Sequence, residues 1–410
     1  MTKLEKLLQE LCPEGVVYKT LGEIATDVFR GAGITRDQVR ETGTPCVRYG
    51  EIYTTYGVWF EDCVSHTDET LLTSKKYFDY GDILFAITGE SVEDIAKCCA
   101  YIGHETCLAG GDIVVLKHNE DPKYLSYALS TLDAQKQKSK GKVKSKVVHS
   151  SVPDIKAIRI PVPPLPVQRE IVRILDNFTE LTAELTAELT AELTARKKQY
   201  AYYRDKLLST NNSSVPVVEL RDIVKKSCSG ATPAKGNAEY YENGTIPWIR
   251  TQDVRFNEIT EVNSYITEKA VSETATKWIP ENCVIVAISG ATAGRCAINK
   301  IKATTNQHCL NLIIDDSMAL YRYVFHCLCS KYEELISRKQ GARGDLNSSL
   351  ILSLPIPIPS LEVQKRLVEV LDNFDAICSD LKIGLPAEIE ARQKQYEYYR
   401  DKLLTFTPAD

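Results

Sequence analysis

The sequence predicts an α+β protein in which two mixed α/β domains are separated by two long antiparallel helices, with an internal pseudo-twofold repeat. Residues 195–208 return as residues 391–404, with twelve of fourteen positions identical. Residues 175–178 (LDNF) return as 371–374 at the same offset of 196 residues, so the stretch between the matches aligns without a gap. Each copy follows short apolar runs bounded by turn residues, which are typical of strands. A repeat this long exceeds a solenoid unit and indicates two half-proteins in one chain.

The repeated stretch is predicted to be a long helix in both copies, because its apolar residues recur in steps of three and four. The side chains expected to join the two helices are Leu181, Leu185, Leu189 and Leu193 in the first copy and Ile377, Leu381, Leu385 and Ile389 in the second. A continuous helix of about 40 residues is about 60 Å long. One apolar stripe of that length needs a partner, so we expect the two copies to pair as a spacer between the domains. The alternative is a coiled coil between two separate chains.

Gly384-Leu385-Pro386 interrupts the second helical stretch and has no counterpart in the first. A proline inside a helix costs about 3 kcal/mol and kinks or breaks it. Either the second arm bends here, or one helix ends near Lys382 and another begins at Pro386. Because the apolar steps continue across the interruption, we expect a kinked arm of unchanged length.

The repeat divides the chain into five parts. We expect an N-terminal helix within residues 1–15, a first globular domain at 16–160, a helical region at 161–210, a second globular domain at 211–354 and a helical region at 355–410. Each helical region is entered through a run of alternating prolines. Proline cannot continue a sheet ladder but starts a helix well, so these runs mark the exits from the domains.

The composition is that of an ordinary globular protein, and we expect the chain to be cytoplasmic. The sequence has no N-terminal signal peptide and no apolar run long enough to span a bilayer. Its thirteen cysteines are scattered without a CxxC pair, which indicates reduced, mostly buried thiols. Cys98-Cys99 and residues 326–329 (HCLC) are the tightest clusters, but structural zinc needs four ligands at finger-like spacing, so we predict no metal site.

Known catalytic motifs are missing from the sequence. It has no glycine-rich phosphate loop, no GxSxG, no HExxH and no metal-spaced His/Asp cluster. The run 152–156 (VPDIK) faintly suggests a nuclease element. We interpret it instead as a short helix that Ser151 caps, with Pro153 and Asp154 in its first turn. A catalytic site is therefore hard to find in this sequence.

Basic, glycine-containing loops stand at equivalent places in both halves, just before each proline run. The predicted DNA-binding side chains there are Lys136, Lys138, Lys140, Lys142, Lys144 and Lys146 in the first half and Arg338, Lys339 and Arg343 in the second. Such loops suit phosphates, whose neutralisation supplies much of protein–DNA affinity. The net charge of −5 argues against a protein that coats nucleic acid, and it leaves room for local basic patches. For either loop alone, a solvated charge run is the usual explanation.

Polar residues on turns are the candidates for reading bases. They are Arg48 and Tyr49 in the first half and Arg250, Thr251 and Gln252 in the second. Arginine reads guanine, and glutamine reads adenine, through paired hydrogen bonds. The same residues could instead be satisfied within their turns.

Taken together, the duplicated helices, the divergent globular halves, the proline exits and Thr182-Ala183-Glu184-Leu185 repeated three times to Leu193 closely resemble the DNA specificity subunit of type I restriction-modification enzymes. The resemblance covers essentially the whole chain. The TAEL repeat between two heads and the paired KQYxYYRDKLL segments are its most specific features, and Gln168 and Gln364 after the proline exits also fit.

The resemblance implies that each head is a target-recognition domain for one half of a bipartite, asymmetric DNA site. The helices, known in this family as conserved regions, would separate the heads and dock two modification (methyltransferase) subunits. Restriction and translocase subunits would join them. This chain would itself be non-catalytic, which agrees with the missing motifs. S-adenosylmethionine, ATP and magnesium would be bound by these partners and not by this chain. No membrane partner is implied.

The TAEL run allows one physical estimate. Four residues lengthen a helix by about 6 Å and advance it roughly 40° beyond a full turn. One base pair advances DNA by about 3.4 Å and roughly 35°. The rotations agree and the translations do not, and our hypothesis is that each repeat adds about one base pair between the half-sites. Two other functions compete with DNA recognition. One is a coiled-coil scaffold with two protein-binding heads, which salt-sensitive binding to one bipartite duplex would exclude. The other is a self-sufficient nuclease or methyltransferase with an unrecognised site, which cleavage or methyl transfer by the purified chain alone would support.

Overall fold

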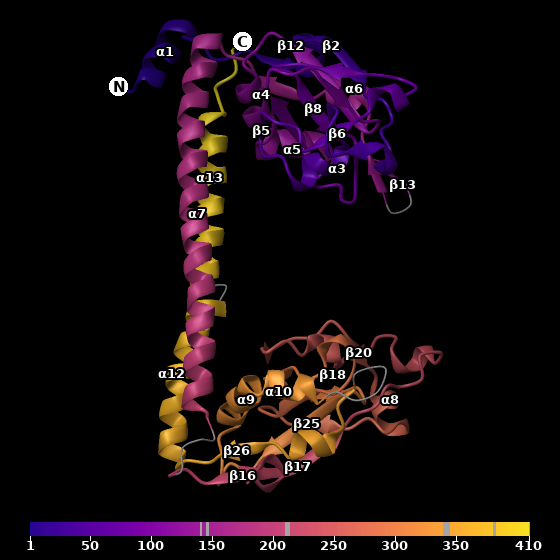
Figure 1. Ribbon diagram of the computed structural model, residues 1–410, viewed down its shortest axis with the longest axis vertical. Helices are drawn as coiled ribbons and strands as arrows, with labels where there is room; N and C mark the ends of the chain where they lie inside the picture. Colours follow the sequence, from indigo (N-terminus) through magenta and orange to yellow (C-terminus); the bar gives the residue numbers. More distant parts are fainter. Residues whose placement is uncertain (140–141, 145–146, 210–213, 339–344, 380–382, 410) are drawn as a thin grey trace. The chain divides into compact units, whose positions relative to one another are not determined.

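The computed structural model describes residues 1–139, 142–144, 147–209, 214–338, 345–379 and 383–409. The chain divides into a first unit, Met1–Glu188 with Ile389–Asp410, and a second unit, Leu189–Glu388. Each unit contains one globular head and a segment of paired helices (Figure 1). The predicted combination of two mixed α/β domains with long helices is confirmed.

The first head is built on two five-stranded sheets. The first has the order β2 (Ala25–Arg30), β12 (Ile113–His118), β8 (Ile83–Ala86), β10 (Cys98–Tyr101) and β5 (Trp59–Phe60). The second has the order β3 (Val39–Arg40), β6 (Ser65–Thr67), β4 (Thr44–Val47), β11 (Cys107–Ala109) and β7 (Tyr77–Phe78). Two smaller sheets pair β13 (Lys142–Lys144) with β14 (Val147–His149) and β9 (Thr88–Gly89), and β1 (Tyr18–Thr20) with β15 (Arg159–Pro161).

The second head repeats this plan. Its five-stranded sheet has the order β17 (Val224–Ser229), β25 (Cys309–Ile314), β22 (Val284–Ala287), β23 (Cys296–Asn299) and β19 (Glu258–Ile259). A four-stranded sheet has the order β20 (Tyr265–Ile266), β18 (Ile246–Ile249), β24 (Ala303–Thr305) and β21 (Trp278–Ile279). Strands β16 (Val217–Glu219) and β26 (Pro355–Pro357) pair as β1 and β15 do.

The central strand of each head is buried on both faces, because its side chains alternate between two cores. In β8, Ile83 and Phe85 join the core against the helices, while Leu84 and Ala86 join the core toward the second sheet. In β22 the same alternation divides Val284 and Val286 from Ile285 and Ala287.

Short helices close the heads. In the first unit they are α2 (Leu21–Ile24), α3 (Tyr49–Thr54), α4 (Pro122–Leu129), α5 (Leu132–Lys138) and α6 (Val152–Lys156). In the second they are α8 (Glu268–Glu273), α9 (Tyr321–Ser330), α10 (Tyr332–Ser337) and α11 (Ser348–Leu352). Ser151 caps α6 with Pro153 in the first turn, as predicted. None of the helices in the described ranges combines the length and apolarity needed to cross a bilayer.

The long helices are α7 (Leu165–Leu207), α12 (Leu361–Ser379) and α13 (Leu385–Leu403). In the first unit α7 lies along α13, where Phe178 stacks on Tyr399; in the second it lies along α12, where Tyr203 contacts Phe374 (Figure 1). The pairing is therefore within one chain. The expected kinked arm is wrong: α12 ends at Ser379 and a separate helix begins at Leu385, with Pro386 in its first turn, where proline is tolerated.

The apolar stripe differs from the prediction at one pair of equivalent positions. Leu181 is 63% exposed and Ile377 is 47% exposed, whereas Cys378 next to Ile377 is buried. Leu185, Leu189, Leu193, Leu385 and Ile389 are half-buried, and Leu381 lies outside the described residues. Leucines spaced by four advance about 40° around the helix at each repeat, so they cannot all face one partner. The prediction that Leu181 and Ile377 join the helix contact is therefore wrong.

Two buried glutamines tie the heads to the helices. The Gln168 Oε1 accepts a hydrogen bond from Asp121 N at 2.9 Å, and its Nε2 donates to Pro163 O and Glu120 Oε2, both at 2.7 Å. Its repeat equivalent Gln364 accepts from Leu320 N at 2.9 Å and donates to Pro359 O and Met318 O. Both side chains are fully buried. Each glutamine therefore satisfies backbone groups of a head from the first turns of a long helix.

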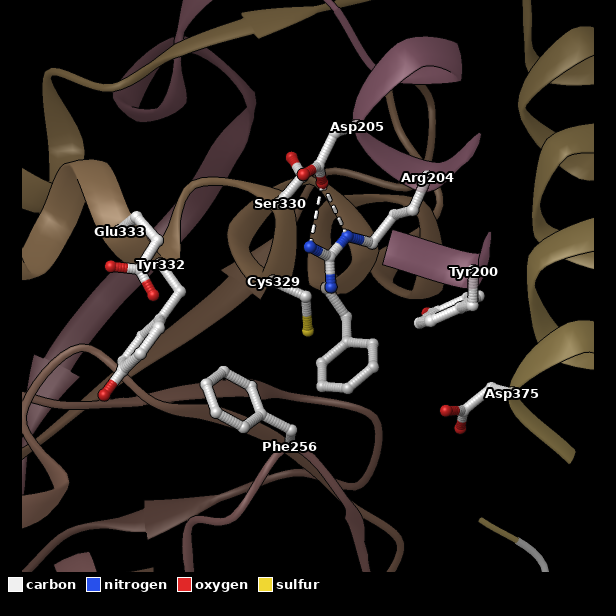
Figure 2. Close-up of a pocket in the computed structure, with 10 residues that line it drawn as sticks. Tyr200, Arg204, Asp205, Phe256, Cys329, Ser330, Tyr332, Glu333 and Asp375 are labelled. Atoms are coloured by element: carbon white, nitrogen blue, oxygen red, sulfur yellow. Dashed lines mark hydrogen bonds and ion pairs between the residues drawn. The ribbon is translucent and has the colours of Figure 1, made fainter. Parts of the chain in front are cut away.

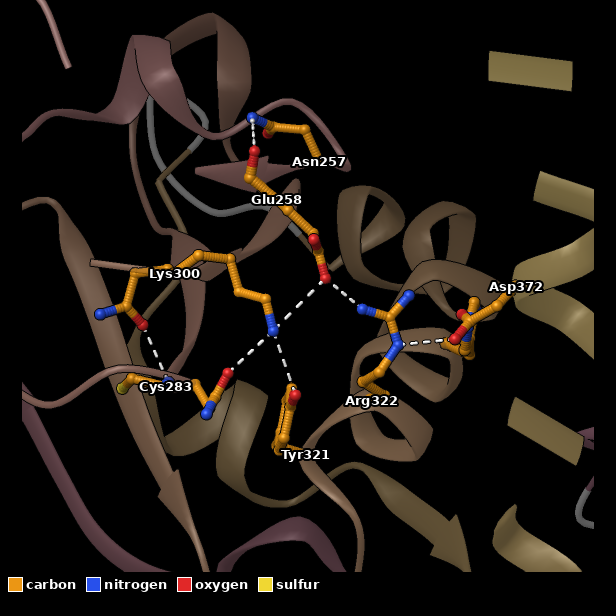
Figure 3. Close-up of polar contacts among 10 residues, drawn as sticks. Asn257, Glu258, Cys283, Lys300, Tyr321, Arg322 and Asp372 are labelled. Atoms are coloured by element: carbon orange, nitrogen blue, oxygen red, sulfur yellow. Dashed lines mark hydrogen bonds and ion pairs between the residues drawn. The ribbon is translucent and has the colours of Figure 1, made fainter. Parts of the chain in front are cut away.

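A carboxylate eight residues, or about two turns, further along each helix forms a second link. Asp176 accepts from Tyr127 OH at 2.8 Å and from Lys123 Nζ at 2.9 Å. Asp372 accepts from Arg322 Nε at 2.7 Å and lies 2.8 Å from His326 Nε2. Figure 3 shows that Arg322 also reaches Glu258, which Lys300 approaches from the other side.

The N-terminal helix α1 (Lys3–Leu11) belongs to the core of the first unit. Leu4, Leu7 and Leu8 pack on the same core as Leu403 and Phe406. Val16 N donates to Thr407 O at 2.9 Å, so the segment after α1 pairs with the end of the chain. The two ends of the described chain thus complete one head together.

Candidate nucleic-acid interface

Arg48 and Arg250, both predicted as base readers, occupy equivalent places. Each directly follows a strand, because β4 ends at Val47 and β18 ends at Ile249. Gly110 N donates to Val47 O at 2.8 Å, and Asn306 N donates to Ile249 O at 3.0 Å. The same backbone contact therefore positions both arginines beside the loop that follows β11 or β24.

A glycine shapes the neighbouring turn in both heads. A Cβ atom at Gly31 would clash with Gly110 O, and one at Gly230 would clash with Thr305 O. The next residue of each turn then donates to the same strand, from Ala32 N to Ala109 O and from Ala231 N to Thr305 O. Glycine is required here because two backbones approach closely. Together these turns and the arginines enclose a surface groove on each head.

Groove 1, in the first head, has a volume of about 440 Å³. It is lined by Gly33, Ile34, Thr35, Arg36, Arg48, Tyr49, Gly50, Glu51, Thr54, Gly110, Gly111 and Asp112. Its central arginine is paired: Arg48 Nε lies 3.1 Å from Glu51 Oε1, which also accepts from Ser65 Oγ at 2.7 Å. Asp112 is paired with Arg30. Groove 1 therefore neutralises much of its own charge.

Groove 2, in the second head, has a volume of about 580 Å³. It is lined by Thr232, Lys235, Tyr241, Trp248, Arg250, Asn263, Ser264, Tyr265, Asn306, Gln307 and His308. None of these described lining residues is acidic, while Lys235 and Arg250 are cationic. Four rings, those of Tyr241, Trp248, Tyr265 and His308, contribute to the wall. Cations among aromatic and amide side chains can bind phosphates and base edges.

Several groove residues were not predicted from the sequence, among them Lys235, Trp248 and His308. The signal that could have found them is the shared Gly-Ala pair at residues 31–32 and 230–231, which marks the same turn in both heads. Of the predicted neighbours, Tyr49 lines groove 1 and is 39% exposed. Thr251 and Gln252 form a 3₁₀ turn beside groove 2, and Gln252 O accepts from Arg255 Nε at 2.6 Å.

The predicted basic loops are described only in part. Lys136 is exposed on α5, and Lys142 and Lys144 belong to β13, which pairs with β14. Arg338 is paired with Glu334. Lys140, Lys146, Lys339 and Arg343 lie outside the described residues.

Lys138 is not available to DNA, and this prediction is wrong. Its side chain is 5% exposed, and its Nζ donates to Leu129 O at 2.6 Å. Leu129 ends α4, where helix carbonyls lack partners within the helix and a lysine is a favourable donor. The alternating lysine pattern therefore predicted DNA contact for a lysine that instead hydrogen-bonds the C-terminal end of α4.

A smaller cavity of about 220 Å³ lies between the head and α7 in the second unit (Figure 2). The rings of Tyr200, Phe256 and Tyr332 and the carboxylates of Glu333 and Asp375 line it. Burial raises the pKa of Asp375, which faces this partly apolar space. Arg204 at its edge is paired with Asp205.

The cysteine clusters form no metal site in the described part of the chain, where no group of three or more His, Cys, Asp or Glu side chains could hold a metal ion. His326 is bonded to Asp372 instead. Burial raises the pKa of Cys46 and Cys283 to about 12, so both thiols stay protonated at neutral pH. These thiols are therefore poor nucleophiles.

Comparison with known proteins agrees with the repeat. The family model described as "Type I restriction modification DNA specificity domain" matches twice, at residues 13–195 and 212–391. The chain belongs to the type I restriction-modification DNA specificity family. The two matches together cover most of the chain, one for each half of the repeat. A coiled-coil scaffold with protein-binding heads is not favoured, because the family is one of DNA sequence specificity.

Individual relatives support the assignment. The chain is 39% identical over 295 residues to the type I restriction enzyme EcoR124I/EcoR124II specificity subunit of Escherichia coli, covering 69% of this chain and 70% of that one. It is 33% identical over 279 residues to the putative specificity subunit S.HindORF215P of Haemophilus influenzae, covering 65% and 68%.

Two solved structures share the fold. One, described as concerning complex assembly and conformational transition of the type I R-M system, has a TM-score of 0.71 at 17% identity and covers 96% of this chain and 98% of that one. The other, the HsdS subunit from Thermoanaerobacter tengcongensis, has a TM-score of 0.56 at 16% identity and covers 96% of both chains.

Proposed function

We propose that this specificity subunit reads a bipartite, asymmetric DNA site, one half with each head. Residues 16–160 and 211–354 would be the recognition domains, and 161–210 and 355–410 the helical regions that fix their spacing. The observation that carries the proposal is the pair of grooves, which the same backbone contacts build but different side chains line. Equivalent sites with different linings suit a target whose two halves differ.

The subunit would itself be non-catalytic and would act in the cytoplasm in a complex with two modification subunits and with restriction subunits. S-adenosylmethionine, ATP and magnesium would be bound by those partners. Adenine methylation would then report where this chain has directed the complex.

Exposed aromatic ladders on the helices are the surfaces proposed for the modification subunits. In the first unit Phe178, Tyr399 and Tyr398 form a chain of ring contacts, with centroids 6.1 Å and 5.3 Å apart. In the second, Phe374, Tyr203 and Tyr202 form the equivalent chain, at 6.5 Å and 5.3 Å. Tyr398 is 62% exposed and Tyr202 is 61% exposed. Rings exposed to this degree at two repeat-related places suit a partner that binds twice.

The test of the function is to map methylated adenines in cells that carry this subunit with its modification subunits. A single two-part motif that disappears with the subunit is the expected result. A motif that persists without this chain, or methylation without sequence preference, would reject the proposal.

The helical spacer has a separate test, deletion of residues 186–189, which removes one TAEL unit. Because four residues advance a helix by roughly 40° beyond a full turn and one base pair advances DNA by roughly 35°, we expect both half-sites unchanged and the gap between them shorter by about one base pair. An unchanged gap would show that the repeat does not measure the spacing.

A further inference from the structure

Arg250 lines groove 2 and forms no ion pair with any described residue. Its backbone N–H donates to Asp253 Oδ2 at 2.8 Å, but its guanidinium is not paired with that carboxylate. Its Nε atom is buried without a hydrogen-bond partner in the described chain. A buried donor without a partner is unfavourable. Among the described residues, the head therefore does not commit this guanidinium to a partner of its own.

The position of this guanidinium is set by a rigid platform. Its Cζ lies 5.9 Å from the ring centroid of Trp248. Trp248 is 7% exposed, and its Nε1 donates to Ala231 O at 3.2 Å, in the turn that Gly230 makes possible. The arginine is therefore held against a fixed indole at the wall of an open groove, as a preorganised donor should be.

The equivalent arginine in the first head, Arg48, forms an ion pair within that head. Arg48 Nε pairs with Glu51, and Glu51 is buried and also bonded to Ser65 and to Arg48 N. At the corresponding place the second head has Asp253, which bonds the backbone and leaves the side chain alone. Glu51 thus fixes Arg48 inside its own head, whereas no carboxylate among the described residues is paired with Arg250.

We propose that Arg250 reads a guanine in the half-site bound by the second head, and that Arg48 has a supporting role in the first. This inference rests on the proposed function. A guanidinium only donates hydrogen bonds, and guanine presents two acceptors, O6 and N7, in the major groove. The absence of carboxylates from the described lining of groove 2 disfavours cytosine, whose exposed group there is a donor.

The experiment compares methylated motifs from cells that carry the wild-type subunit, Arg250→Ala or Arg250→Lys with the same modification subunits. We expect Arg250→Ala to lose discrimination for one G·C pair of the second half-site, by on the order of ten- to a hundredfold, with the first half-site unchanged. Arg250→Lys keeps the positive charge but lacks the two parallel donors of the guanidinium. Compared with Arg250→Ala, it should restore DNA binding more than it restores discrimination for the G·C pair. Arg221→Ala, which removes an arginine of the second head that is paired with Glu219 and lies outside the groove lining, is the matched control and should leave the motif unchanged.

The outcomes separate the inference from the function on which it rests. A wild-type two-part motif that Arg250→Ala leaves intact overturns the inference alone, and so does a second half-site without a G·C pair. The absence of any motif dependent on the wild-type subunit overturns the function. If Arg250→Ala abolishes methylation, the inference is tested by DNA binding instead. Complexes that carry Arg250→Lys are competed with duplexes altered at each G·C pair of the second half-site. Discrimination as strong as that of the wild type at every pair would reject the inference.

Discussion

The two units hold their heads by the same positions with different chemistry. Lys123 of the first unit bridges Asp176 and the face of Trp59, with its Nζ 3.9 Å from the ring centroid. At the equivalent place Arg322 bridges Asp372 and Glu258. The carboxylate at this repeated position of the helix accepts from a cationic side chain of the head. That side chain can be lysine or arginine, provided that the head also supplies a suitable second contact for it. Indole suits the lysine and a second carboxylate suits the arginine.

The grooves differ in a more consequential way. Both are built by the same glycine turn and the same backbone hydrogen bonds, but groove 1 pairs its arginine internally and groove 2 does not. At the contact between a head and the helices, the change from lysine to arginine is matched by a change in the residue that it contacts. In the solvent-exposed grooves the chemical differences are not matched in this way, and this difference supports the proposal that the grooves contact DNA.

The largest effect is expected from breaking a glutamine link. Gln168→Leu leaves Asp121 N and Pro163 O buried without partners, which should destabilise the first unit by about 3 kcal/mol. Gln364→Leu should do the same to the second unit through Leu320 N and Pro359 O. Hydrogen exchange of the intact protein measures this, because faster exchange should be confined to the unit that carries the substitution.

The same experiment tests whether the two heads are anchored independently. If either substitution accelerated exchange equally in both units, the two heads would not be independently anchored. Gln168→Glu is a matched control that keeps the acceptor oxygen but not the donor, so its effect should be localised in the same way.

The aromatic ladders should give the next largest effect. Tyr202→Ser with Tyr203→Ser should weaken one of the two modification-subunit sites by about 2 kcal/mol, or roughly thirtyfold, because exposed tyrosines at interface centres contribute most of the binding energy. Tyr398→Ser with Tyr399→Ser should weaken the other. Native mass spectrometry of the assembled complex should show a single bound copy in either case. Two copies retained with wild-type affinity would exclude the ladders as docking surfaces.

The repeat explains what could be predicted from the sequence. The offset of 196 residues pairs Gln168 with Gln364, and the matching runs 43–48 and 244–250 pair Arg48 with Arg250. Residues at equivalent positions of a repeat have the same backbone environment. Turn residues also predicted their own structure, as Ser151 and Pro153 did at the start of α6.

Side-chain direction and pairing could not be predicted in the same way. Lys138 belongs to an alternating lysine run, yet the helix α5 turns it toward Leu129 O. Leu181 and Ile377 satisfy the apolar spacing but are exposed, whereas Cys378 beside Ile377 is buried. The commitment of Arg48 to Glu51 depends on Ser65, which is distant in sequence and meets the pair through β6. Each of these outcomes depends on contacts that the local pattern does not contain.

A smaller effect should separate the two groove arginines by stability. Arg48→Ala removes the cation beside buried Glu51 and should lower the free energy of unfolding by about 1 kcal/mol. Arg250→Ala removes no protein ion pair in the described chain and should leave it unchanged or slightly higher. Urea unfolding of the two variants at neutral pH measures the difference. Equal losses would mean that Arg250 has a structural partner after all.

The smallest effect concerns pH and is confined to the first unit. Glu170 on α7 accepts from Arg173 at 2.7 Å and from Lys3 of α1 at 2.8 Å, and these bonds lower its pKa from its usual 4.5 to about 2. A depressed carboxyl pKa contributes stability above the unfolded value that is lost as pH falls toward the folded value. The contact of α1 with α7 should therefore weaken between about pH 4.5 and 2. The second unit has Arg366 at the equivalent position, paired with Glu362, and so lacks this carboxylate. Urea midpoints measured between these pH values should fall less steeply for Glu170→Gln than for the wild type, whereas parallel curves would show that the α1 contact does not depend on this charge.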